Sequence, residues 1–184
     1  PVVRAQDERE TVHPVYQSNQ KSRVSNVYSN QGAREKMIAT YMGLITQVDD
    51  NVGRMMAWLD ETGRAKDTLI IFTSDHGEQM GDHHLLGKLG YFDASFHIPL
   101  IIRDPDFDPS RGNAQIDHFT ENVDIMPTIL DWLDLECPVQ CDGQSLRPLI
   151  QKGTPTGHWR EEAHWEYDFR NIPAGEALEQ RLGL

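Results

Sequence analysis

Apolar residues recur every three or four positions between Ala33 and Thr62. The series is Met37, Tyr41, Leu44, Val48, Val52, Met55 and Leu59. This spacing places one apolar face along a helix, and Gly63 follows where a left-handed residue commonly ends one. The pattern predicts an amphipathic helix over residues 33–62. Asp49 and Asp50 fall mid-helix, where adjacent side chains point about 100° apart, so we interpret them as a solvated face rather than a metal site.

Two short segments show no alternation of polar and apolar residues. Residues 68–74 carry four large apolar residues in a row, and residues 98–103 carry a similar run after Pro99. Unbroken apolar runs are typical of strands buried on both faces of a parallel sheet. We expect the two segments to be neighbouring or near-neighbouring strands, with Pro99 near the start of the second, where a missing N–H is tolerated.

Shorter elements fill the rest of the chain. Residues 123–135 predict a helix with Pro127 in its first turn, and its buried stripe would be Ile125, Ile129, Trp132 and Leu133. We expect a helical turn over 146–150, a loop over 153–157, a strand over 162–169 and an irregular lead-in over 1–32. Buried strands between amphipathic helices give an α/β fold, with helices 33–62 and 123–135 packed on the sheet.

Composition narrows the class of protein. The 184 residues are 38% hydrophobic and 25% charged, with 17 Lys and Arg against 29 Asp and Glu, a net charge of −12. This balance argues against nucleic acid held by bulk charge. No apolar run approaches the roughly 18 residues of a membrane span, so we expect no membrane partner. The two cysteines are too few for a disulfide framework and are interpreted as ordinary thiols, which is compatible with a cytoplasmic location.

Candidate chemistry follows the first predicted strand at Ser74-Asp75-His76-Gly77. In open α/β sheets, sites form outside the carboxyl ends of strands. Asp75 offers a hard oxygen ligand and His76 a nitrogen ligand, so the pair can meet one divalent cation. An Asx-turn beside a surface histidine is the alternative for these four residues.

The segment that follows is a glycine-punctuated loop rich in ionisable groups. Residues 81–88 contain Asp82, His83 and His84 and end in Gly87-Lys88. A lysine ammonium is a compact cation suited to neutralising an oxyanion, although an isolated lysine is more often a surface residue.

The run Thr68 to Glu78, with Gly81-Asp82-His83, Gly87-Lys88 and Ile98 to Ile102, resembles the sulfatase branch of the alkaline phosphatase superfamily. Within that branch the sequence is most similar to bacterial phosphonate monoester hydrolases, which also cleave phosphodiesters. The resemblance extends over about residues 33–170 and includes the helices around Asp49 and Pro127. It implies an alkaline-phosphatase-like sandwich, whose central, mostly parallel sheet is flanked by helices.

The resemblance also implies roles for individual residues. Asp75 and His76 match two ligands of a single divalent metal ion, which could be Mn, Ca, Mg or Zn. Lys88 matches the lysine that contacts the charged oxygens of the substrate. His83 and His84 lie on the same loop and would support the ligands from behind or lie at the surface.

The family nucleophile is a formylglycine made from Cys or Ser in a Cys/Ser-x-Pro-x-Arg motif, and this chain has no such motif. The chain therefore resembles the C-terminal portion of a longer enzyme with its nucleophile upstream. Residues 1–157 would belong to the catalytic α/β domain, and residues 158–184 would begin a smaller C-terminal subdomain. The 184-residue chain alone should be inactive.

The resemblance predicts metal-dependent hydrolysis of phosphonate monoesters and phosphodiesters, with a small anionic ester as substrate and a homo-oligomer as the intact form. A sulfate ester hydrolase with the same parts is the alternative. A binding module that keeps the fold would be expected to lose ionisable residues from the strand-exit loop, whereas Asp75, His76 and Lys88 are all present. A flavodoxin-like domain would need a glycine-rich turn before the Asp-His pair, and none is present.

Overall fold

The computed structural model describes residues 13–21, 23–88, 90–108, 110 and 115–166. Its described residues fall into two compact units. The first contains residues up to 65 together with 72–101, and the second contains 66–71 together with 102–166. The fold mixes helices and sheet, as the α/β prediction requires. The boundary predicted after residue 157 stays a prediction.

The first unit begins with short helices rather than an irregular segment. They are α2 (Pro14–Gln20), α3 (Arg23–Asn26) and the 3-10 turn η1 (Val27–Ser29). The prediction of irregular structure over 1–32 is therefore wrong for residues 14–20, 23–29 and 31–32, while residues 1–12 and 22 lie outside the described residues. Helices this short depend on tertiary contacts instead of local periodicity. Gln20 supplies one, because it is buried and its Nε2 donates to the carbonyl of His83 at 2.7 Å.

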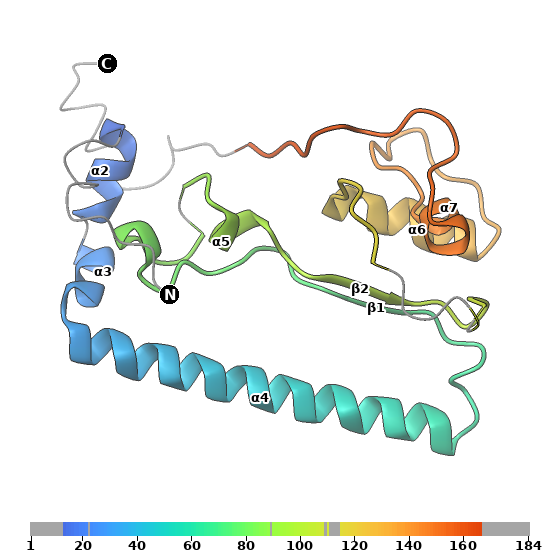
Figure 1. Ribbon diagram of the computed structural model, residues 1–184, viewed down its shortest axis with the longest axis horizontal. Coiled ribbons are helices and arrows are strands. Elements are labelled where there is room, and N and C mark those ends of the chain that lie inside the picture. Colours follow the sequence, from blue (N-terminus) through green and yellow to red (C-terminus); the bar gives the residue numbers. More distant parts are fainter. Residues whose placement is uncertain (1–12, 22, 89, 109, 111–114, 167–184) are drawn as a thin grey trace. The chain divides into compact units, whose positions relative to one another are not determined.

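The long helix is confirmed almost to the residue as α4 (Gln31–Glu61), drawn as one unbroken helix in Figure 1. The side chain of Asn30 caps its start by accepting the Ala33 N–H at 3.0 Å. Gly63 takes φ 68° just beyond its end, the left-handed conformation expected of a helix-terminating glycine.

The predicted packing of this helix is not found. No residue of α4 is buried, and Leu44 and Met55 are 53% and 63% exposed. The apolar spacing correctly identified one face of a helix, but burying that face needs a second apolar surface. The described part of the chain does not cover it.

The two predicted strands are confirmed as hydrogen-bonded neighbours, β1 (Ile70–Thr73) and β2 (Leu100–Arg103) (Figure 1). Between them lie the 3-10 turn η2 (Asp82–His84) and the helical turn α5 (Asp93–Phe96). Burial on both faces is wrong, because Phe72 is 39% and Ile101 62% exposed. A sheet of two strands leaves its faces open unless other elements cover them.

The second unit contains a 3-10 turn and two helices, η4 (Asn122–Asp124), α6 (Ile125–Trp132) and α7 (Arg147–Lys152). The helices predicted over 123–135 and 146–150 are thus confirmed, and 153–157 is a loop. The predicted buried stripe is wrong in part: Ile125, Ile129 and Trp132 are half-buried, and Leu133, which caps the end of α6, is 51% exposed. The strand predicted over 162–169 is wrong for 162–166, and 167–169 lie outside the described residues.

A polar network organises this unit around Asp124, which is fully buried. Its carboxylate accepts the Glu121 and Gln144 N–H groups, each at 2.8 Å, and pairs with both terminal nitrogens of Arg160. The start of α6, the segment before α7 and the segment around Arg160 are therefore joined at one carboxylate.

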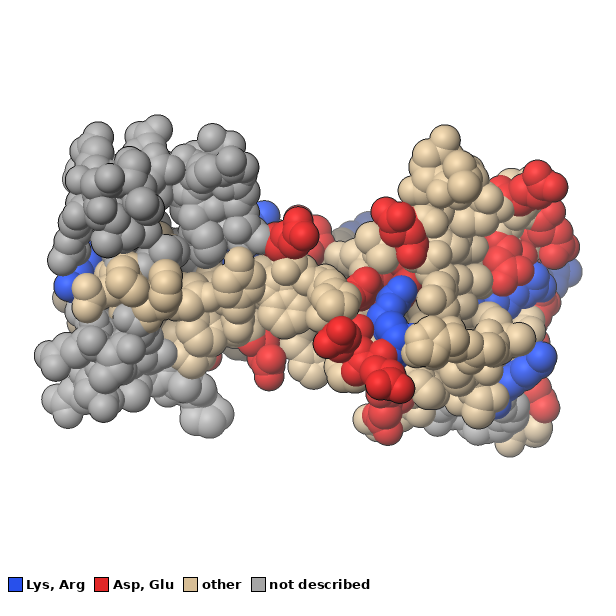
Figure 2. Space-filling model, turned by 90° about the horizontal axis from the view of Figure 1, so that it is seen from above, with Lys and Arg blue, Asp and Glu red and all other residues tan. Residues whose placement is uncertain are grey.

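The described surface carries more acid than base. Acidic side chains predominate among the charged groups on the face shown in Figure 2, in keeping with the net charge of −12. Among the described residues, no helix is long and apolar enough to cross a membrane.

Candidate active site

The Asp-His turn follows β1 directly and is built by local hydrogen bonds. Ser74 Oγ donates to the carbonyl of His76 at 2.7 Å, and the His76 N–H donates to Asp75 Oδ1 at 3.0 Å. An Asx-turn would direct the Gly77 N–H to the Asp75 side chain. That N–H instead donates to the carbonyl of Ser95 at 2.7 Å, so the Asx-turn alternative does not fit.

The side chains of Asp75 and His76 lie together. His76 Nδ1 is 2.8 Å from the Gly77 carbonyl, which can only accept, so Nδ1 carries the proton and Nε2 of the neutral ring keeps its lone pair. Nε2 is 3.6 Å from Asp75 Oδ2. Two ligand atoms of a tetrahedral ion with bonds of about 2.1 Å lie about 3.4 Å apart. The pair can therefore supply an oxygen and a nitrogen to one cation.

Electrostatics favour the ionised form of Asp75. The hydrogen bond from the His76 N–H lowers the pKa of the Asp75 carboxyl, and the positive charge of Lys88 acts in the same direction. Lys88 is exposed. The structure thus brings the ammonium of Lys88 within electrostatic reach of Asp75.

Gly77 lies where the turn touches α5. A Cβ at this position would come within 2.1 Å of the Ala94 carbonyl oxygen and 3.0 Å of its carbon. Those atoms belong to the backbone of α5, so they cannot rotate away as a side chain would. The close approach of two backbones requires glycine here.

Gly77→Ala should therefore lower the free energy of unfolding by about 1–3 kcal/mol, the usual cost of forcing an extra methyl into packed structure. Urea denaturation would measure it. Gly53→Ala is the matched control, because Gly53 lies inside α4 with nothing within 4 Å of an added Cβ. Alanine there should stabilise by about 0.8–1 kcal/mol. Equal effects of the two substitutions would contradict the close approach.

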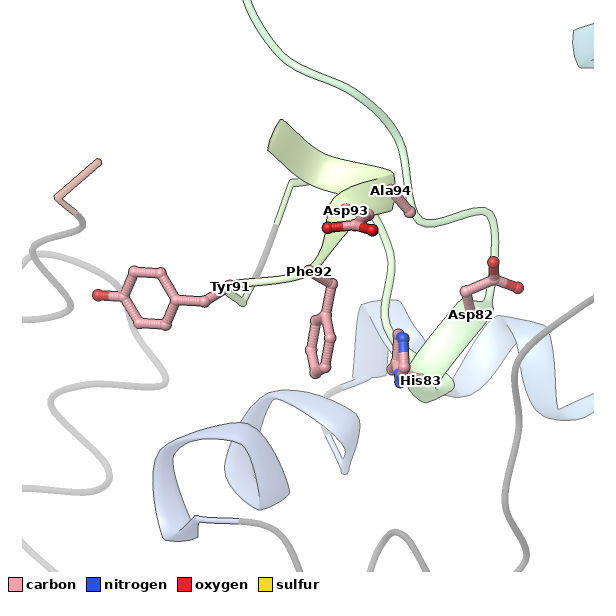
Figure 3. A pocket seen from close by; sticks show the side chains of 6 residues that line it. All are labelled: Asp82, His83, Tyr91, Phe92, Asp93 and Ala94. Atoms are coloured by element: carbon pink, nitrogen blue, oxygen red, sulfur yellow. The ribbon is translucent and has the colours of Figure 1, made fainter. Parts of the chain in front are cut away.

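The histidines of the loop have a different setting. His83 and His84 both adopt left-handed backbone conformations, with φ 51° and 58°. The ring of His83 stacks on Phe92 with centroids 3.7 Å apart. Figure 3 shows this pair in a cavity of about 380 Å³, lined by Asp82, His83, Tyr91, Phe92, Asp93 and Ala94. This cavity is not lined by the principal candidate residues, which are Asp75, His76 and Lys88.

Two donors do not complete a metal site. Over the described ranges, no group of three or more His, Cys, Asp or Glu side chains is placed to hold a metal ion. Cys137 and Cys141 are free thiols.

Sequence reasoning missed the groups that build the frame of the site. Glu78 Oε1 accepts the Gly87 N–H at 2.6 Å, and Gln79 Nε2 donates to Ser95 Oγ at 2.7 Å in a buried contact. A carboxylate directly after Asp-His-Gly was a visible signal, but its partner lies nine positions away on the return of the loop. The spacing of hydrophobic and polar residues along the chain does not predict that pairing.

Comparison with known proteins finds a family and relatives that match most of the chain. A family model described as sulfatase matches residues 9–135. The multifunctional alkaline phosphatase superfamily protein PehA of Trinickia caryophylli is 54% identical over 143 residues, 78% of this chain and 27% of the relative. An arylsulfatase of Clostridium perfringens is 36% identical over 141 residues, 76% of this chain and 29% of the relative.

Two solved structures agree with this placement. Phosphonate monoester hydrolase SpPMH from Silicibacter pomeroyi superposes with a TM-score of 0.77 at 37% identity, over 88% of this chain and 33% of that one. The phosphonate monoester hydrolase of Agrobacterium radiobacter gives 0.74 at 47% identity, over 83% and 30%. The chain spans between about a quarter and a third of the length of these relatives.

Proposed function

The chain belongs to the sulfatase family, and we propose that it forms part of a longer, metal-dependent hydrolase of phosphonate monoesters and phosphodiesters. The observation that carries the proposal is the Asp75–His76 pair, whose Oδ2 and Nε2 atoms lie 3.6 Å apart and whose carboxylate is influenced by the Lys88 charge. The names of the relatives support the reaction class, since both superposed structures are phosphonate monoester hydrolases.

In this proposal Asp75 Oδ2 and His76 Nε2 hold one divalent cation. The Gly77 carbonyl fixes the imidazole by accepting from Nδ1, which leaves Nε2 available as the ligand. The cation, when bound, lowers the pKa of the nucleophile and screens charge on the transferring group. The remaining ligands and a formylglycine nucleophile would lie upstream of this chain.

Lys88 performs a separate task. Its ammonium cannot bind a cation, but it can neutralise the non-bridging oxygens of the ester as charge redistributes in the transition state. Overall the reaction consumes one water, breaks the bond from phosphorus to the leaving oxygen and releases an alcohol. The three side chains act on opposite charges: Asp75 and His76 hold the cation, and Lys88 binds the anionic substrate.

The experiment is a substrate comparison on the longer protein. The purified enzyme should show its highest kcat/KM on an aryl phosphonate monoester or aryl phosphodiester. A higher value on an aryl sulfate would replace the proposal by a sulfatase, the reading that the 36% identical arylsulfatase supports. No turnover of any of the three esters would favour a non-catalytic module.

The 184-residue chain by itself should show no metal-dependent turnover of the same esters. Two protein ligands leave a divalent ion mostly hydrated and weakly bound. Calorimetric titration with Mn²⁺ or Zn²⁺ would check the binding, alongside the ester assays. Turnover that depends on added metal would contradict a nucleophile outside the chain.

A further inference from the structure

The loop that carries Lys88 is closed by the Glu78 carboxylate where residues 78–80 lie against Gly87, a place that we call the neck of the loop. The Gln79 N–H donates to the Gly87 carbonyl at 2.9 Å, which joins the outgoing and returning sides of the loop. Glu78 Oε1 accepts the Gly87 N–H at 2.6 Å and the Met80 N–H at 3.2 Å. A carboxylate oxygen therefore holds both sides of the neck, in charge-assisted hydrogen bonds that are about twice as strong as neutral ones.

The neck determines where the next residue starts. Gly87 has φ +70°, a conformation that turns the chain sharply before Lys88. The Lys88 side chain is exposed, and a lysine ammonium is carried on a long aliphatic stem whose origin is set by the backbone. The position of its ammonium then depends on the backbone at Gly87, which Glu78 and Gln79 hold.

The residues on either side of Glu78 are held by hydrogen bonds to Ser95 of α5. Gln79 is buried and donates to Ser95 Oγ, and the Gly77 N–H donates to the Ser95 carbonyl at 2.7 Å. Glu78 thus lies between two fixed residues. Its backbone is anchored beside the Asp-His turn while its carboxylate reaches across to the return of the loop.

We infer that Glu78 is a positioning residue, whose carboxylate holds Gly87 so that the Lys88 ammonium faces the anionic substrate beside the cation that Asp75 and His76 hold. The inference rests on the proposed function for the role of Lys88. It predicts that Glu78 acts on anion binding through Lys88 and leaves the metal ligands intact.

Amide hydrogen exchange on the intact protein tests the contact. In Glu78→Ala the Gly87 N–H should exchange about 10–100-fold faster, the factor expected when a hydrogen bond to a charged group is lost. Glu78→Gln keeps the reach and an acceptor oxygen and should lie between Glu78→Ala and the native protein. Glu61→Ala, an exposed glutamate at the end of α4, is the control and should change nothing. Unchanged exchange in Glu78→Ala would overturn the inference.

A double-mutant cycle tests the action through Lys88. The dissociation constant for inorganic phosphate is measured for the native protein, Glu78→Ala, Lys88→Ala and the double variant. Glu78→Ala alone should weaken phosphate binding about tenfold or more, and should add almost nothing once Lys88 is Ala. A merely structural Glu78 would give the same loss in both backgrounds, which would overturn the inference.

The phosphate readout separates this inference from the proposed function. Coupled loss of binding in a protein that hydrolyses no ester would support the positioning of Lys88 and overturn the function. Full turnover of phosphonate esters with an additive cycle would support the function and overturn the positioning. Metal content measured on each variant should stay at the native level.

Discussion

Asp75→Ala should deprive the intact protein of its metal and its turnover together, whereas Lys88→Ala should leave the metal bound and lower turnover alone. Losing a partner that merely supports a metal ligand already costs 10–100-fold in affinity, so losing a charged ligand should cost at least about 100-fold. Removing a preorganised charge-stabilising donor costs about 10²–10³ in rate, and the deficit from Lys88→Ala should appear in kcat/KM.

Metal analysis and steady-state kinetics on the same preparations check both variants. Asp50→Ala is the matched control, since Asp50 is an exposed carboxylate on α4 that we interpret as part of a solvated face. It should keep both metal and activity. If Lys88→Ala retains near-native kcat/KM on phosphonates, phosphodiesters and sulfates alike, Lys88 is a surface lysine and the site assignment is wrong.

Local patterns predicted the elements that depend on local forces. The predicted helix over 33–62 became α4 (Gln31–Glu61) because its spacing and its terminal glycine are properties of a single segment. The apolar runs likewise located β1 and β2. The same patterns overestimated burial, as Phe72 shows at 39% exposed, because burial depends on what covers an element.

The helices near the start of the described chain were not predictable in this way. α2 buries Asn19 and Gln20, two polar residues that carry no hydrophobic signal. Gln20 donates to His83, 63 positions later in the chain. A contact across that separation is a property of the fold, so a segment-by-segment reading sees only a polar lead-in.

The candidate site likewise has one part that the sequence predicts and another that depends on the fold. Asp75 and His76 are adjacent in sequence, so their proximity could be anticipated from the strand exit that carries them. Glu78 reaches Gly87 only because the loop returns, and the sequence contains no measure of that return. The pair of Asp124 and Arg160 is separated by 36 positions and joins segments whose sequences predicted no relation.

Asp124→Asn should lower the free energy of unfolding of the second unit by about 3–5 kcal/mol, the cost of breaking a buried ion pair from one side. The carboxylate is fully buried, and Asn would turn an amide NH₂ toward the Arg160 guanidinium, which is also a donor. The hydrogen bond to Asp124 raises the pKa of Arg160 above its already high usual value. That stabilisation is present below the unfolded-state pKa and is lost only above it, so the effect of Asp124→Asn should not vary between pH 6 and pH 9, about three or more units below the arginine pKa.

Asp134→Asn separates this effect from the general loss of a charge pair. Asp134 pairs with Arg147 at 3.3 Å, but its side chain is 88% exposed. Exposed pairs contribute about 0.2–1 kcal/mol, and Asn tolerates the left-handed backbone of φ 53° at this position. Urea denaturation followed by circular dichroism should therefore show a loss for Asp124→Asn several times larger than for Asp134→Asn.

Arg160→Met should give a loss between those of the two aspartate variants, because it leaves the Asp124 carboxylate with the Glu121 and Gln144 N–H groups as partners. Equal losses for the two aspartates would mean that solvent reaches Asp124, and that the segment around Arg160 is not fixed to the start of α6 by this carboxylate.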